Sequence, residues 1–307
     1  MRNYKGHLYL IMSFTMAGTS IITAKFLTAL GTFTITSVCL FLILLILTPF
    51  CHVRIINYLK SLNCNDWIMI CFQAVFGIFL FRAFLLSGLK ITSSLEAGIL
   101  ISCSPVITST LAHFFLKEKA NAKTFLGVSL AFIGILLLQG INTRLNTSHL
   151  LGNLLVLCAA ASESVFNTLS RIYSRSKSQG NKLFDPLLQT MLVSFVALIL
   201  CLLPAFREHP FKSLSILDIR GWLSIIWYGF VVTLLSYILW YAGIKRCNTY
   251  TAAAYSCIMP LTSMLLSFII LGEAITGIQW VGSGLILLGV MLITIFTSKQ
   301  VIAKESQ

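Results

Sequence analysis

Stretches of about twenty apolar residues recur ten times along this chain, and this recurrence restricts its possible folds more than any other feature. A helix of about 20 such residues crosses the hydrocarbon core of a bilayer. The stretches are 8–28, 32–51, 67–88, 95–116, 123–141, 150–171, 186–205, 220–243, 250–271 and 277–297. The sequence has no strand-type alternation separated by turns, which argues against a membrane barrel. It therefore predicts an all-α polytopic membrane protein with ten transmembrane helices.

Charged residues make up only 10% of the 307 residues, whereas hydrophobic residues make up 57%. A soluble domain carries about a quarter charged residues, so we expect most of this surface to face lipid. The net charge of +13 does not indicate a nucleic-acid partner, because Lys and Arg lie in short gaps between apolar stretches. Most of them fall on the side that also holds both termini. The positive-inside rule therefore predicts both termini in the cytoplasm, with the chain in a cell or inner membrane.

Cysteine and histidine give no sequence pattern typical of a metal site or a catalytic centre. The nine cysteines occur singly, without a CxxC pair, and mostly inside apolar stretches, where Cys behaves as a small hydrophobic residue. The five histidines are isolated from one another: His7, His52, His113, His149 and His209. No GxxxxGK[ST] loop occurs, so we do not expect ATP hydrolysis by this chain. The sequence predicts no enzyme activity, no catalytic residues, no metal and no cofactor.

An internal repeat relates the two halves of the chain. Residues 88–105 align with residues 243–260 at an offset of 155. This offset pairs Gly88 with Gly243, Lys90 with Lys245, Pro105 with Pro260, Glu118 with Glu273, Gly127 with Gly282, and Gly134 with Gly289. Near the start of each half, an offset of 146 pairs Gly6 with Gly152 and Lys25 with Arg171. We expect two units of five helices each, 1–145 and 146–307.

Five helices per unit is an odd number, so the second unit must enter the membrane from the side opposite to the first. Inverted repeats of this kind are typical of secondary transporters, which bind substrate near the midplane between the halves. Rocking of one half against the other would then give alternating access. A duplicated structural bundle without a transport role is the alternative.

The paired motif is a proline, a glutamate after twelve residues, a glycine after eight more, and a second glycine after six more. It includes Leu116-Lys117-Glu118 in the first half and Leu271-Gly272-Glu273 in the second. This motif resembles the EamA-type repeat of the drug/metabolite transporter superfamily, over about residues 6–297. The resemblance implies a ten-helix carrier of a bacterial inner membrane, often an exporter of amino acids or other metabolites. Lys117 departs from the family pattern, which has glycine there.

Pro105 and Pro260 are predicted to lie in the middle of the fourth and ninth helices. Each proline lacks an N–H and leaves the carbonyl four residues earlier, in Ile101 or Ser256, without its helical partner. Hydroxyl groups such as those of Ser104 and Ser256 can cover such backbone groups at membrane depth. We expect a kinked helix that lines a cavity in each half. A kink that serves only packing is the alternative.

Glu163 is the one acidic residue deep inside a predicted helix, which makes it a candidate for substrate or proton binding. Asn167 and Ser170 follow on the same helical face. The run that contains Glu163, Thr168, Leu169 and Arg171 also resembles the first helix of small multidrug-resistance transporters. That resemblance implies a glutamate that binds protons and cationic substrates in competition. The first half has Ala17 at the matching position, and a structural ion pair is the alternative role.

Arg82 in the third helix could bind a substrate carboxylate while Glu163 binds an amine. Counting about 1.5 Å per residue from the predicted helix ends puts Arg82 about 22 Å and Glu163 about 12 Å from the inner boundary. A gap of roughly 10 Å suits a bound zwitterion. An ion pair between Arg82 and Glu96 is the alternative.

Tyr237, Trp240 and Tyr241 share one face of the eighth helix and could form an aromatic wall that holds a cation. Anchoring at the membrane interface is the alternative for these three residues. Glu118 and Glu273 end the fourth and ninth helices, where we expect a structural role in the following loop or helix.

The sequence predicts a secondary carrier that moves a small metabolite by alternating access. We expect export of amino acids or related metabolites, coupled to protons or to exchange. Efflux of drugs or cationic compounds is one alternative, and a membrane sensor or receptor without flux is another. The expected partners are the substrate, the lipid bilayer and possible coupling protons, in a monomer or a homodimer.

Overall fold

The computed structural model describes residues 2–27, 30–89, 91, 100–101, 103–116, 122–139, 150–179, 184–215, 217–247, 249–272 and 275–305. Every regular element within these residues is a helix. Six helical runs are long and apolar enough to cross a membrane: Thr32–Lys60, Cys64–Leu85, Leu150–Lys177, Pro186–Arg207, Ile219–Ile244 and Thr251–Ile270. The prediction of an all-α, multi-pass membrane protein is confirmed.

The described helices of the first half are α1 (Arg2–Gly18), α2 (Ser20–Lys25), α3 (Thr32–Lys60), α4 (Cys64–Ala74), η1 (Val75–Leu80), α5 (Phe81–Leu89), α7 (Ser104–Leu116) and α8 (Ala122–Gln139). Those of the second half are α9 (Leu150–Gln179), α10 (Pro186–Arg207), α11 (Pro210–Leu214), α12 (Ile219–Trp227), η3 (Tyr228–Leu235), α13 (Ser236–Ile244), α14 (Thr249–Ser256), α15 (Ile258–Leu271) and α16 (Gly277–Glu305). Helical residues occur in each of the ten predicted apolar stretches.

Three helices are longer than the apolar stretches that predicted them. α3 continues to Lys60, α9 continues to Gln179, and α16 continues to Glu305. Each extension is rich in polar or basic residues, which are good helix formers that keep their charged groups in water. The apolar stretch therefore marks the part of the helix in the membrane core and underestimates the whole helix.

Both prolines of the repeat lie at interruptions of their helices. Ser256 ends α14, a turn at Cys257 follows, and Pro260 lies in the first turn of α15. Pro105 likewise lies in the first turn of α7, directly after a turn at Cys103. Proline is tolerated in a first turn, because the N–H groups there have no partner within the helix. The predicted kinks therefore take the form of helix breaks.

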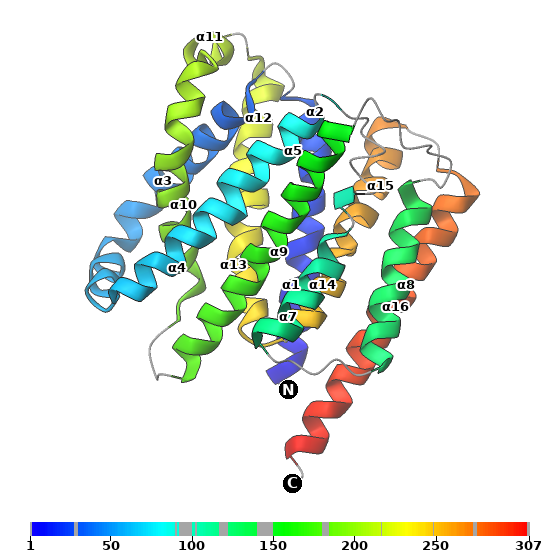
Figure 1. Ribbon diagram of the computed structural model, residues 1–307. Helices are drawn as coiled ribbons and strands as arrows, with labels where there is room; N and C mark the ends of the chain where they lie inside the picture. Colours follow the sequence, from blue (N-terminus) through cyan, green and yellow to red (C-terminus); the bar gives the residue numbers. More distant parts are fainter. Residues whose placement is uncertain are drawn as a thin grey trace.

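The helices pack mostly across the two halves of the chain. α1 packs against α13 and α15, α5 and α7 pack against α9, α3 packs against α10, and α8 packs against α16. Figure 1 shows α8 and α16 side by side at one edge of the bundle, with α3, α4 and α10 at the other. The two halves of the chain therefore form a single bundle.

Glycines allow the close approach of α8 and α16. A methyl group added to Gly134 would lie 2.6 Å from the Gly282 carbonyl oxygen, and one added to Gly289 would lie 2.5 Å from the Gly127 carbonyl oxygen. Any side chain at either position would overlap with the opposing backbone, so only glycine fits this crossing. The repeat pairs Gly127 with Gly282 and Gly134 with Gly289. In the structure, Gly134 contacts the equivalent of Gly127, and Gly289 contacts Gly127 itself, so the two contacts are equivalent to each other.

Polar contacts fasten α3 to α10 at both ends. α1 begins and α16 ends at the same end of the bundle, which we call the terminal face (Figure 1). There Arg54 of α3 forms an ion pair of 2.5 Å with Asp185, which also caps α10 by accepting from the Leu187 N–H. At the opposite face Glu208, after α10, accepts a hydrogen bond of 2.8 Å from the Thr34 N–H.

Candidate functional site

Two π-helical segments interrupt the long helices at the centre of the bundle. η1 continues α4 into α5, and η3 continues α12 into α13, in the third and eighth predicted stretches. π-helical segments disturb the regular hydrogen-bond ladder and occur frequently at functional sites. The Tyr237 hydroxyl donates to the Gly77 carbonyl of η1 at 3.3 Å. Because Tyr237 lies two residues after η3, this hydrogen bond links the two π-helical regions.

Arg82 and Tyr237 occupy equivalent positions of the repeat. Each lies two residues after its π-helical segment, at the offset of 155 that relates the two halves. The Arg82 guanidinium donates to the Thr36 hydroxyl at 2.5 Å and lies 5.2 Å from the centre of the Tyr228 ring. It has no carboxylate partner among the described residues. The neighbours of Arg82 thus supply a hydroxyl and an aromatic face but no compensating negative charge.

Glu163 of α9 lies beside Ser104 of α7 and has no cationic partner in the described part of the chain. Tyr237 interacts electrostatically with both Glu163 and Arg82. The Ser104 backbone carbonyl accepts a hydrogen bond from Ser164 at 3.0 Å, which fixes α7 against α9 at this level. The structure therefore brings the predicted acid, base and tyrosine to one site.

The three central side chains are neither fully buried nor fully exposed. Glu163, Arg82 and Tyr237 each keep an intermediate exposed fraction, unlike the fully buried Tyr241 next to them. Both charged residues belong to helical runs that are long and apolar enough to cross a membrane. These polar groups therefore lie at membrane depth and keep part of their surface for water or a polar ligand.

Arg82 and Glu163 lie at similar distances along their helices from a shared ion pair. Lys177 of α9 pairs with Asp66 of α4 at 2.6 Å and gives both helices a common reference point. At about 1.5 Å per residue, Glu163 is about 21 Å along α9 and Arg82 at most about 24 Å along its helix from this pair. The predicted depth of Glu163 was counted from the end of the apolar stretch, whereas α9 continues beyond it to Gln179. The gap of roughly 10 Å between the two charges stays a prediction.

An aromatic cluster forms one wall of the site. Phe166 of α9 contacts the rings of Tyr237, Trp240 and Tyr241 at centroid distances of 5.8, 6.4 and 6.3 Å. Trp240 is 5% exposed and Tyr241 is fully buried, so these two are not anchors at the lipid interface. A methyl group on Gly77 would lie 2.4 Å from the Phe166 ring, which shows that this cluster needs glycine in η1.

A buried network of amides and phenols lies next to the aromatic cluster. The Gln73 side-chain oxygen accepts hydrogen bonds from Tyr241 at 2.6 Å and from the Gln189 amide at 3.1 Å. Tyr58 donates to the Gln189 oxygen at 3.5 Å. Sequence reasoning missed Gln73, Gln189 and Phe166. A glutamine inside an apolar stretch was the available signal for the two amides, whereas nothing in the sequence marks Phe166.

The other predicted residues have different environments. Asn167 is buried on α9, and the Ser256 hydroxyl donates to Ala253 of its own helix at 2.7 Å. Pro105 is near the site because Ser104 lies there, whereas Pro260 belongs to the break between α14 and α15. Glu118, Glu273 and Glu96 lie outside the described residues.

Comparisons with known proteins agree with this architecture. The EamA-like transporter family matches residues 4–139 and again residues 150–295. The uncharacterized transporter YetK of Bacillus subtilis strain 168 is 29% identical over 247 residues, which cover 78% of this chain and 71% of that protein. A protein of Salmonella typhimurium strain LT2 named "Probable amino-acid metabolite efflux pump" is 28% identical over 198 residues, covering 64% of this chain and 66% of that protein.

A solved crystal structure superposes on this chain with a TM-score of 0.79 at 18% sequence identity, covering 97% of this chain and 99% of that one. The likeness at this identity shows the fold. Two matches to one family together span most of the chain, so the chain belongs to the EamA-like transporter family. It is a multi-pass transporter of the drug/metabolite type and not an enzyme.

Proposed function

We propose that this protein is a secondary carrier that exports a small zwitterionic metabolite, of the amino-acid class, by alternating access. One observation carries the proposal: Glu163 and Arg82 lie in membrane-spanning helices, are partly exposed, are close to the same tyrosine and have no opposite charge among the described residues. An uncompensated charge at membrane depth is costly. A ligand with one amine and one carboxylate would neutralise both charges at once.

The proposed roles follow from the neighbours of each charge. Glu163 binds the substrate amine when no proton occupies it, so that proton and substrate compete. Arg82 binds the carboxylate, and its contacts with Thr36 and Tyr228 hold the guanidinium in place. The aromatic wall of Tyr237 and Trp240 covers the apolar part of the substrate. The efflux pump named above for amino-acid metabolites supports the same substrate class.

Alternating access rests on two five-helix halves, 1–145 and 146–307, in inverted orientation. The exchanged contacts Gly134–Gly282 and Gly289–Gly127 support this relation, because a two-fold axis turns one contact into the other. The equivalence of Arg82 and Tyr237 around the site supports the same axis. We place both termini, and thus the terminal face, in the cytoplasm of a cell membrane, because most of the basic residues lie there.

A counterflow experiment tests the proposal. The purified protein is reconstituted into vesicles, and exchange of radiolabelled amino acids is compared with exchange of an amine and of an acid that lack the second charge. We expect saturable exchange of a zwitterion by the wild type. We expect a loss of about a hundredfold in Glu163→Gln, because removing the carboxylate leaves the substrate amine as an unpaired buried charge, which costs several kcal/mol. Asp218→Asn, at a helix cap away from the site, should keep full exchange.

Exchange of cationic amines alone, with Arg82→Gln as active as the wild type, would favour drug or amine efflux. Saturable ligand binding without any flux would favour a receptor. Full exchange in Glu163→Gln would exclude the role assigned to that residue.

A further inference from the structure

A buried polar seam runs along α9 from Glu163 to the terminal face. Its members repeat at alternating intervals of four and three residues and therefore lie on one face of the helix: Glu163, Asn167, Ser170, Ser174 and Lys177. The four residues after Glu163 are at most 6% exposed. At about 1.5 Å per residue the seam is about 21 Å long. Buried polar residues are costly in a membrane helix, so a row of them over this distance indicates a functional role.

Polar groups of this seam and of the buried amide network lack hydrogen-bond partners. The side-chain nitrogen of Gln73 and the Ser174 hydroxyl make no hydrogen bond within the part of the chain that the structure describes. Both side chains are fully buried. Buried polar groups are normally hydrogen-bonded, because leaving one unpaired destabilises the fold. Unpaired donors along a polar seam are groups that entering water could satisfy.

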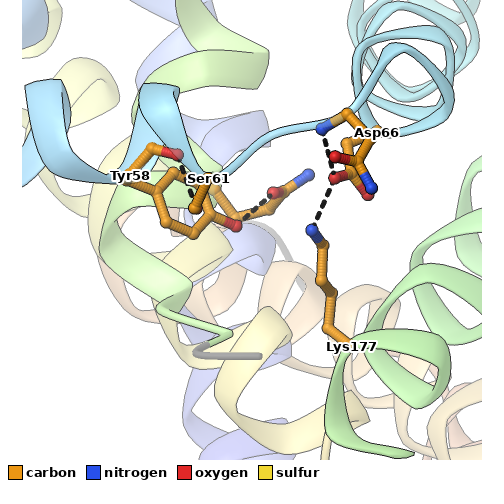
Figure 2. A network of polar contacts seen from close by, with 6 residues as sticks. Tyr58, Ser61, Asp66 and Lys177 are labelled. Atoms are coloured by element: carbon orange, nitrogen blue, oxygen red, sulfur yellow. Dashed lines mark hydrogen bonds and ion pairs between the residues drawn. The ribbon is translucent and has the colours of Figure 1, made fainter. Parts of the chain in front are cut away.

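An ion pair closes the end of the seam at the terminal face. The Lys177 ammonium group lies 2.6 Å from the Asp66 carboxylate, and both side chains are largely buried. Figure 2 shows Lys177 pointing from α9 to Asp66, at the beginning of α4, with Tyr58 and Ser61 of the neighbouring segment beside them. The ammonium group also lies 5.4 Å from the centre of the Tyr173 ring. The pair joins the first half of the chain to the second.

We propose that the α9 seam is the cytoplasmic path to the central site and that the Asp66–Lys177 pair is its gate. This inference rests on the proposed carrier function. When the pair separates, α4 moves from α9, water enters along Asn167, Ser170 and Ser174, and the substrate reaches Glu163. When the pair forms, the seam closes as in this structure and the site is shut off from the terminal face.

Solvent access to the seam can be measured without transport. The exposed Cys64 and Cys71 are first replaced by serine, and Ser174→Cys is then introduced into protein held in lipid nanodiscs. The rate of reaction with a water-soluble, sulfonated maleimide is compared with and without Lys177→Gln. The same chain without the introduced cysteine gives the background. We expect Lys177→Gln to raise the labelling rate of Ser174→Cys at least about tenfold, the factor that corresponds to a modest shift of a two-state equilibrium.

The chain offers matched controls. Ser164 is as fully buried as Ser174 and belongs to the same helix, but its hydroxyl is held by the carbonyls of Ser104 and Ala160. Ser164→Cys should therefore stay unreactive in Lys177→Gln. Arg54→Gln removes another ion pair of this face, whose arginine is 61% exposed, and should leave Ser174→Cys protected. Lys177→Arg keeps the pair with Asp66 and should also leave it protected.

An unchanged rate for Ser174→Cys in both Lys177→Gln and Asp66→Asn would overturn the gate. Equal increases at Ser164→Cys and Ser174→Cys would also overturn it, because they would indicate general loosening of the bundle. Counterflow separates this inference from the proposed function. If the protein exchanges amino acids but Lys177→Gln does not change the labelling rate, it is a carrier without this gate. If Lys177→Gln raises the labelling rate but the protein exchanges no amino acid, the path is retained and the carrier function is rejected.

Discussion

The first helices of the two halves, α1 and α9, come from equivalent positions of the repeat but differ in chemistry and continuity. α9 runs for 30 residues without a break and carries the polar seam. α1 ends at Gly18, and the offset of 146 puts Ala17, Ile21 and Ala24 where α9 has Glu163, Asn167 and Ser170. Both helices pack across the bundle, but only α9 brings a charge to the site.

One repeated contact shows how the two helices diverged. In the second half, the Ser164 hydroxyl donates to the Ser104 carbonyl at 3.0 Å. At the equivalent place, a methyl group on Gly18 would lie 2.7 Å from the Met259 carbonyl oxygen. The same backbone approach is thus stabilised by a hydroxyl in one half and by the absence of a side chain in the other. The two halves thus share the packing, whereas the acidic residue of the site lies on one of these two helices alone.

Moving the acid from α9 to α1 should have the largest effect. We expect the double variant Glu163→Ala with Ala17→Glu to keep the loss of about a hundredfold in counterflow expected of Glu163→Gln, because the α1 position lies near Met259 and lacks the Ser104 neighbourhood. The control is Ala17→Glu alone, which shows whether the added acid harms folding. Recovery of more than half of the wild-type exchange would show that the two helices are functionally interchangeable.

Neutralising the base should have an intermediate effect. Arg82→Gln removes a charge-assisted contact to the carboxylate, so we expect a loss of roughly ten- to a hundredfold for the zwitterion. Exchange of an amine that lacks the carboxylate should change far less, since it never used Arg82. The ratio of the two rates is the measurement. An equal loss for both compounds would assign Arg82 to packing against Tyr228 and Thr36.

The glycines of α8 and α16 should show the smallest effect and test the symmetry itself. Gly134→Ala and Gly289→Ala each place a methyl group against an opposing carbonyl, so both should destabilise the bundle by about 1–3 kcal/mol. Gly284→Ala on α16 meets only open space and should be close to neutral. Thermal unfolding in detergent gives the comparison. A large difference between the first two variants would contradict equivalent contacts.

Much of the site could be predicted from single residues, because charge is conspicuous in a membrane helix. Glu163 and Arg82 were identified as the rare charged residues of apolar stretches, and the structure brings them near the same tyrosine. The position of Lys177 could not be interpreted in the same way. It lies beyond the apolar stretch, where a basic residue ordinarily marks the membrane boundary, whereas the structure pairs it with Asp66 in the protein interior.

The sequence by itself determined the helical class, the repeat, the transporter family and the charged residues of the site, because apolar length, fixed offsets and rare charges are properties of the chain. Only the tertiary structure decided which residues meet. It set the depth of Glu163 through the extension of α9, packed Phe166 on Gly77, and joined Asp66 to Lys177. These contacts depend on how helices from distant parts of the sequence cross, and local periodicity carries no information about the partner of a given face.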